Sequence, residues 1–185
     1  VRVLREASGG ALKSRVRTAR EFMSARFPLN ETQWREWIAD EVRATVGKPL
    51  KRAELVGSLF ERAVNDYLSV PLWLGYAEFS LDQGWDATRR RELYERALSL
   101  AGLHFTEGHK IWAAYRAFEL SELETATRTT GGAGEKEKEV KRAEERVRTL
   151  LHRQLAIPHA QMDDTKAMAE EWERARRSVG RGGDD

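Results

Sequence analysis

The chain has 185 residues, of which 41% are apolar and 34% are charged, so it is long enough to bury a sizeable core. Its 32 basic and 30 acidic residues nearly cancel, and most basic residues have an acidic one three or four positions away, as Glu92 and Arg96 do. That pattern indicates solvated helix faces rather than a nucleic-acid footprint. Cysteine is absent, which excludes disulfides, a cysteine nucleophile and thiolate zinc sites.

No apolar run approaches the roughly 20 residues needed to cross a bilayer, so no membrane partner is expected. The opening residues lack a signal-peptide core and an initial Met. We therefore expect a segment of a longer protein.

Caps, breakers and apolar spacing predict helices along the whole chain. Asn30 is expected to cap the second helix, with Gln33 at the capping-box position, and Asp86 to cap the fifth. Gly47 to Pro49 breaks the chain, and Pro71 is expected in a first helical turn. The predicted helices, after a fragment at 1–7, span about 11–26, 31–45, 51–68, 71–82, 87–100, 106–124, 136–155 and 161–178.

A tryptophan-marked pattern repeats at intervals of 39 residues, from 34 to 73 and from 73 to 112. Large aromatic residues recur at i and i+3, and in two units also at i+6, which is the spacing of one helix face. We call the helix that carries this pattern helix A. Its marked residues are Trp34, Trp37 and Glu41, then Trp73, Tyr76 and Phe79, then Trp112, Tyr115, Phe118 and Glu119.

A second block follows each helix A and defines helix B. Leu59-Phe60-Glu61-Arg62-Ala63 matches Leu93-Tyr94-Glu95-Arg96-Ala97, and a weaker copy runs from Leu150 to Leu155. The small Ala63 and Ala97 allow a neighbouring helix to approach closely. Each unit is therefore expected to be a helical hairpin.

Trp-x-x-Tyr-x-x-Phe-Glu on helix A with Phe/Tyr-Glu-Arg-Ala on helix B resembles the HAT (half-a-tetratricopeptide) repeat. Longer stretches, above all Arg153-Gln-Leu-Ala-Ile-Pro158, are similar to the N-terminal HAT region of a family of U4/U6 small nuclear ribonucleoprotein recycling factors. The pattern departs at Ser80, where Glu is expected, and at Asp40, where an aromatic residue is expected. In the last unit Lys166 and Ala169 take the first two aromatic positions, leaving Trp172 in register.

The resemblance implies an all-α, right-handed α-α superhelix of HAT hairpins over 1–178. It comprises a partial repeat at 1–28, repeats at about 30–68, 71–101 and 105–156, and an incomplete repeat at 160–178. A flexible loop is expected at 127–137 and a disordered tail at 179–185.

The resemblance also implies a nuclear protein-interaction scaffold in U4/U6 assembly and recycling, with splicing proteins as partners. In that family, RNA recognition lies in C-terminal modules and self-association in a second HAT half, both outside this chain.

The aromatic residues of both blocks are expected to be core. Glu41, Glu119, Arg62 and Arg96 recur in register, which favours ion pairs that brace the hairpins over catalytic acids. The four histidines do not share a helix face, and no phosphate loop or nucleophile motif is present. No enzyme activity, cofactor or metal is therefore expected.

Trp85 lies outside the repeat register, in a predicted loop, next to the run Arg89, Arg90 and Arg91. Loop aromatics and arginines are common at partner interfaces, so these four residues are candidate partner contacts. The alternative is that Trp85 covers the end of its hairpin. Direct RNA binding through Arg15, Arg17, Arg20 and the 89–91 run, or self-association, are alternative functions.

Overall fold

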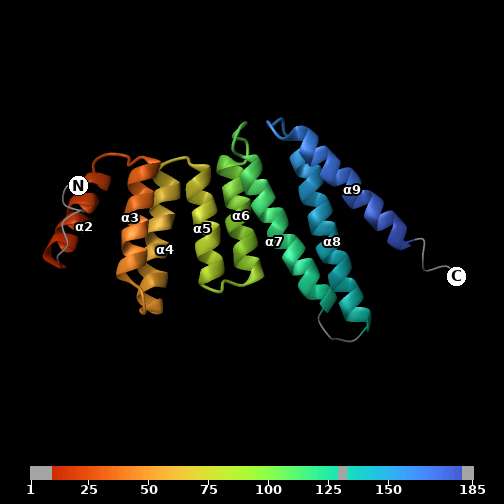
Figure 1. Cartoon of the computed structure of the whole chain (residues 1–185), viewed down its shortest axis with the longest axis horizontal. Helices are drawn as coiled ribbons and strands as arrows, with labels where there is room; N and C mark the ends of the chain where they lie inside the picture. Colours follow the sequence, from red (N-terminus) through yellow and green to blue (C-terminus); the bar gives the residue numbers. More distant parts are fainter. Residues whose placement is uncertain (1–9, 129–132, 181–185) are drawn as a thin grey trace. The chain divides into compact units, whose positions relative to one another are not determined.

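The computed structural model describes residues 10–128 and 133–180, and every regular element within those ranges is an α-helix (Figure 1). The all-α prediction is confirmed. The chain divides into two compact units, residues 1–85 and 86–185. The single domain expected over 1–178 stays a prediction.

The first unit contains α2 (Gly10–Ser24), α3 (Glu31–Ala44), α4 (Pro49–Asp66) and α5 (Val70–Asp82). Helix α3 packs against α4, α4 packs against α5, and α3 also contacts α5 (Figure 1). In the predicted repeat, α2 is a helix B, α3 and α4 are the A and B helices of one hairpin, and α5 is the next helix A.

Local sequence sets where these helices begin. The Asn30 side chain accepts a hydrogen bond from the Gln33 amide (2.9 Å), and the Gln33 side chain accepts one from the Asn30 amide (3.0 Å), so the predicted capping box forms. Pro49 and Pro71 lie in the first turns of α4 and α5, where a missing N–H costs nothing. Gly47 turns the chain before α4 with a φ of +74°, a conformation that favours glycine.

The second unit contains α6 (Ala87–Ala101), α7 (His109–Arg128), α8 (Ala133–Leu155) and α9 (Met162–Gly180). The predicted Asp86 cap forms, with its carboxylate accepting from the Arg89 amide at 3.0 Å. Helix α7 packs against α6 and extensively against α8, and α8 packs against α9 (Figure 1).

The loop predicted at 127–137 is shorter in the structure, because α7 continues to Arg128 and α8 begins at Ala133. Gly134 lies in the exposed first turn of α8, where it disrupts little, and ion pairs such as Glu137–Lys141 (2.7 Å) support the helix beyond it. Residues 179 and 180, predicted to be tail, are the end of α9. The predicted fragment at 1–7, the rest of the loop at 129–132 and the rest of the tail at 181–185 lie outside the described residues.

Helix α7 begins at His109 rather than at the expected residue 106. The preceding turn is tight, since the Gly108 amide donates to the His104 carbonyl at 2.7 Å. A Cβ at Gly108 would lie 2.5 Å from the Gly102 carbonyl oxygen, so only glycine fits there.

Candidate functional site

The aromatic residues in repeat register are buried and join neighbouring helices. Phe60 on α4 stacks on Tyr76 of α5 with ring centroids 5.2 Å apart, and Tyr94 on α6 stacks on Tyr115 of α7 at 4.8 Å. Both contacts connect a helix B to the helix A that follows it. Also nearly or fully buried are Trp34, Trp37, Ala63, Trp73, Phe79, Ala97, Trp112 and Phe118. These residues form the core between repeats and are not free to contact a ligand.

Three bidentate ion pairs also join a helix B to the next helix A. They are Arg17–Glu41, Arg91–Glu119 and Arg148–Glu173. We call them the inter-repeat ion pairs. In each pair, the arginine lies four residues before the glutamate position of the helix B block, which Glu21, Glu95 and His152 occupy. The carboxylate belongs to the residue that directly follows the third aromatic position of helix A. The third pair shows that α9 keeps the register of a helix A despite Lys166 and Ala169.

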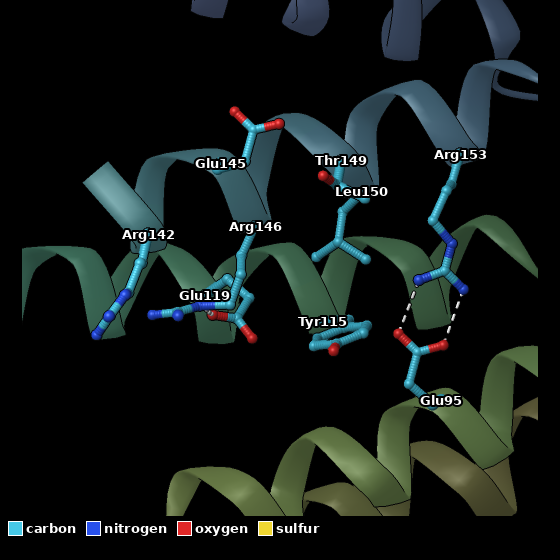
Figure 2. Close-up of a pocket in the computed structure, with 9 residues that line it drawn as sticks. All are labelled: Glu95, Tyr115, Glu119, Arg142, Glu145, Arg146, Thr149, Leu150 and Arg153. Carbon is cyan, nitrogen blue, oxygen red and sulfur yellow. Dashed lines mark hydrogen bonds and ion pairs between the residues drawn. The ribbon is translucent and has the colours of Figure 1, made fainter. Parts of the chain in front are cut away.

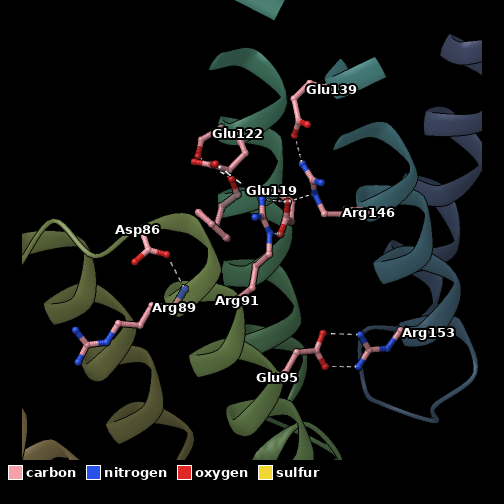
Figure 3. Close-up of polar contacts among 11 residues, drawn as sticks. Asp86, Arg89, Arg91, Glu95, Glu119, Glu122, Glu139, Arg146 and Arg153 are labelled. Atoms are coloured by element: carbon pink, nitrogen blue, oxygen red, sulfur yellow. Dashed lines mark hydrogen bonds and ion pairs between the residues drawn. The ribbon is translucent and has the colours of Figure 1, made fainter. Parts of the chain in front are cut away.

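Glu119 is the most buried of these carboxylates, with 1% of its side chain exposed. It accepts from Arg91 Nε at 2.6 Å and Nη2 at 3.0 Å, and from Arg146 Nε at 3.0 Å (Figure 3). The Glu119 carboxylate holds the pKa of the Arg91 guanidinium above its usual value. These contacts refine the prediction: Glu41 binds Arg17 of the preceding helix B, and Glu119 joins Arg91 of the preceding helix B to Arg146 of its own hairpin.

At each of the two departures from the repeat pattern, Ser80 and Asp40, the residue that would contact the departing one is replaced as well. Ser80 stands where helix A should carry the carboxylate, and Gly57 stands where helix B should carry its arginine. The buried Ser80 hydroxyl instead donates to the Ala77 carbonyl at 2.6 Å. Losing both charges together leaves no buried charge without a partner.

The second departure replaces an aromatic contact with an ion pair. Arg20 occupies the position of Phe60 and Tyr94, and Asp40 that of the third aromatic residue of helix A. Arg20 Nη2 lies 2.8 Å from Asp40 Oδ2, and the arginine side chain is only 6% exposed. The α2–α3 interface therefore uses charge where the α4–α5 and α6–α7 interfaces use aromatic rings.

The arginine of the helix B block has two roles. Arg62 lies over the rings of Trp34 and Trp37, at 5.6 and 5.0 Å from their centroids, and Arg153 lies 5.4 Å over Trp112. Each also pairs with the glutamate of the preceding helix B. Arg62 binds Glu21 (2.9 and 3.1 Å), and Arg153 binds Glu95 (2.7 and 2.8 Å). Arg62 thus braces neighbouring hairpins as well as its own. Arg96, the corresponding residue of α6, is exposed.

The second unit has an open groove of about 350 Å³ between α6 and α8, with α7 as its floor (Figure 2). We call it the α6–α8 groove. Its lining residues are Glu95, Tyr115, Glu119, Arg142, Glu145, Arg146, Thr149, Leu150 and Arg153.

The groove has fixed ion pairs inside and exposed charges at its mouth. Glu119 and Glu95 hold Arg146 and Arg153 in place (Figures 2 and 3). The Arg142 and Glu145 side chains remain 67% and 66% exposed. A rigid surface with displayed charges of both signs can hold a polypeptide segment through side-chain contacts.

The charges on the groove floor follow from these contacts. Hydrogen bonds from Arg153 are the main reason that the pKa of Glu95 lies below its usual value, and a hydrogen bond from the Tyr115 hydroxyl adds to this effect. Burial, followed by the charge of Glu95, raises the pKa of Tyr115 well above its usual value. Tyr115 therefore stays a neutral hydrogen-bond donor and cannot act as a base near neutral pH.

The four predicted partner contacts do not form one exposed cluster. Trp85 is half-buried, with its ring packed edge-on against Tyr76 at 5.7 Å, which is the covering role weighed as the alternative. In the second unit Arg91 is bound to Glu119, and Arg90 lies 4.1 Å over the Phe118 ring. Only Arg89 of that run has an exposed side chain.

Arg146 and Arg148 were not among the residues predicted from the sequence, and Arg17 and Arg91 were predicted only as possible RNA or partner contacts. The sequence does carry a repeated pattern that could have predicted the inter-repeat ion pairs. In each of them, the arginine lies one helical turn before the glutamate position of the helix B block. Within the described residues, no three His, Cys, Asp or Glu side chains are grouped closely enough to hold a metal ion. None of the helices in these residues is long and apolar enough to cross a membrane.

The family model of the PRP39 N-terminal HAT repeat matches residues 4–131. Spliceosome associated factor 3, U4/U6 recycling protein, of Mus musculus is 43% identical over 162 residues, which is 86% of this chain and 15% of the relative. The Homo sapiens protein of that name is 39% identical with the same coverage. The Danio rerio protein is 41% identical over 85% of this chain and 17% of its own length. These findings confirm the resemblance drawn from the motifs, and the chain spans about a sixth of these relatives.

Proposed function

Because the chain belongs to the PRP39 N-terminal HAT repeat family, we propose that it is a protein-interaction scaffold of a nuclear splicing factor. We place its role in the assembly and recycling of U4/U6 particles, because its relatives are named U4/U6 recycling proteins. Its partners are proteins of the splicing machinery, and its work is to present a surface rather than to catalyse a reaction.

The α6–α8 groove is the observation that carries this proposal. The Glu119–Arg91 and Glu95–Arg153 contacts fix its walls, so a partner meets a surface whose side chains are already ordered. Binding then costs less conformational entropy, because fewer side chains are immobilised. Arg142 and Glu145 at the mouth supply charges of both signs. Such a groove suits a polypeptide that carries both acidic and basic side chains.

A protein partner is favoured over RNA because three of the six arginines predicted as possible phosphate contacts are bound to carboxylates. Arg17 and Arg20 pair with Glu41 and Asp40, and Arg91 pairs with Glu119. RNA binding would need arginines and lysines with no acidic partners beside them.

The test is capture of U4/U6 particle proteins from nuclear extract by the immobilised chain, compared between two charge-swapped variants. The first exchanges the groove charges (Arg142→Glu with Glu145→Arg). The matched control exchanges the exposed α7 pair that lies outside the groove lining (Glu124→Arg with Arg128→Glu). Both keep the net charge, so non-specific attraction is unchanged. We expect the groove variant to lose the captured proteins and the control to keep them; equal capture by both variants would refute the assignment of the groove.

RNA binding is tested separately, by fluorescence anisotropy of labelled U6 RNA at two salt concentrations. We expect weak binding that disappears at the higher salt concentration. Saturable binding near physiological salt, stronger than to a scrambled RNA, would replace the scaffold proposal with an RNA-binding one.

A further inference from the structure

A buried polar cluster holds the start of α9 against α7 and α8. Arg116 on α7 is 8% exposed, yet among the described residues no carboxylate pairs with it. Its guanidinium donates to Gln154 Oε1 and lies 3.8 Å from the sulfur of Met168 on α9. Gln154 Nε2 in turn donates to Thr165 Oγ1 at 3.0 Å. The positive charge of Arg116 is therefore held by neutral groups alone, and such a site is costly for any second positive charge.

His159 lies in the turn between α8 and α9 and completes this cluster. The residue is 6% exposed. Its Nδ1 accepts a hydrogen bond from the Gln161 backbone amide at 3.1 Å, at the residue just before α9 begins. Its Nε2 lies 3.4 Å from Thr165 Oγ1 and 3.3 Å from Gln154 Nε2.

These contacts fix the protonation state of the ring. A backbone amide can only donate, so Nδ1 must be unprotonated, and the proton of the neutral ring lies on Nε2 and points to Thr165 Oγ1. Thr165 can accept it, because its own hydroxyl donates to the Gln161 carbonyl at 3.0 Å. A second proton on Nδ1 would face the Gln161 N–H and remove the hydrogen bond that shapes the turn.

We propose that His159 is a proton-sensitive latch, and that its protonation releases α9 from α7 and α8. The surface that α9 completes at this edge of the second unit is then available only when the ring is neutral. This inference goes beyond the scaffold function and rests on different residues from the α6–α8 groove.

The charges around the ring favour this direction. From α7, Arg116 and His109 act on the ring, whereas its contacts from α8 and α9 are the neutral Gln154 and Thr165. Burial, followed by His109 and Arg116, holds the pKa of His159 below its usual value. The pKa of His159 is therefore lower when α9 is docked than when α9 is released. The neutral ring favours docking at pH values above the pKa of the released state. This stabilisation is lost as the pH falls below that pKa.

The test is amide hydrogen exchange of residues 162–177 in the whole chain, from about pH 7.5 to about pH 5.5, corrected for intrinsic rates. We expect the opening equilibrium of α9 to rise by up to about tenfold for each pH unit in the sensitive range, because one proton is taken up. The amides of α7 serve as the internal reference.

His159→Asn is the matched variant. Its side-chain oxygen can accept the Gln161 N–H as an Asx turn does, and it cannot be protonated. The other histidines, including His152, which lies 3.9 Å from Glu173 of α9, remain in place. We expect the pH dependence of α9 to disappear in this variant. An unchanged pH dependence, or no pH dependence in the parent chain, would overturn the proposal.

A nuclear magnetic resonance titration of the His159 ring in the parent chain covers the case in which the variant fails to fold. We expect Nδ1 to gain its proton together with the loss of α9 amide protection. Titration of the ring while α9 stays protected would reject the latch.

Discussion

Glu119 is the best single test of the inter-repeat ion pairs. We expect Glu119→Gln to destabilise the second unit, because the carboxylate accepts three hydrogen bonds from Arg91 and Arg146 and is 1% exposed. The amide that replaces it has one acceptor oxygen and turns an N–H₂ group towards a guanidinium.

The magnitude follows from burial. Breaking a buried ion pair costs about 3–5 kcal/mol, since the remaining charge stays in a poor environment. Arg91 and Arg146 are 25% and 30% exposed and can turn partly to water, which places the cost near the lower end, at about 3 kcal/mol. For a chain of this size that corresponds to a fall in Tm of roughly 6–12 °C.

The assay is denaturant and thermal unfolding followed by circular dichroism, with Glu173→Gln as the matched variant. That residue makes the same bidentate contact with Arg148 but is 26% exposed, and its partner is 40% exposed. Its loss should cost only about 1 kcal/mol. A Glu119→Gln chain that unfolds like the parent, or a Glu173→Gln chain that loses as much, would refute the link between burial and the strength of these pairs.

Three further perturbations test other parts of the fold by the same unfolding assay. Trp73→Ala should cost about 3–5 kcal/mol, because the indole is 1% exposed; a mutant that melts like the parent would mean that the repeat register is wrong. Stability should decline as the pH falls through the lowered pKa of Glu95, because the pairing of its carboxylate with Arg153 stabilises the fold at pH values above the unfolded pKa of the carboxyl group. Glu95→Gln should remove this part of the acid sensitivity, and an unchanged pH profile of stability would contradict the assignment. Replacing Arg20 or Asp40 alone by Phe should destabilise the α2–α3 interface, and the double replacement should recover roughly 0.5–3 kcal/mol of that loss, whereas strictly additive costs would reject the equivalence of the ion pair and the aromatic contact.

The sequence by itself determined the helices, their caps and the aromatic core. The Asn30 capping box, the Asp86 cap and the proline-led starts of α4 and α5 depend on residues within one helical turn, so they can be recognised without knowledge of distant contacts. The burial of Trp34, like that of Trp73 and Trp112, follows from helical periodicity, because an aromatic stripe on a helix has to be covered.

Only the tertiary structure decided which charges meet. Glu41 could have paired with several arginines, and its partner Arg17, 24 residues earlier, follows from the packing of helix B against the next helix A. The Arg91 side chain looked available for a partner, and its bond to a carboxylate 28 residues later removes it from the exposed surface. His159 gave no signal beyond its residue type, because its role depends on the amide, hydroxyl and guanidinium groups that three helices bring around it. Long polar side chains can reach many partners, so the order of the residues along the chain leaves their pairing open until the helices pack.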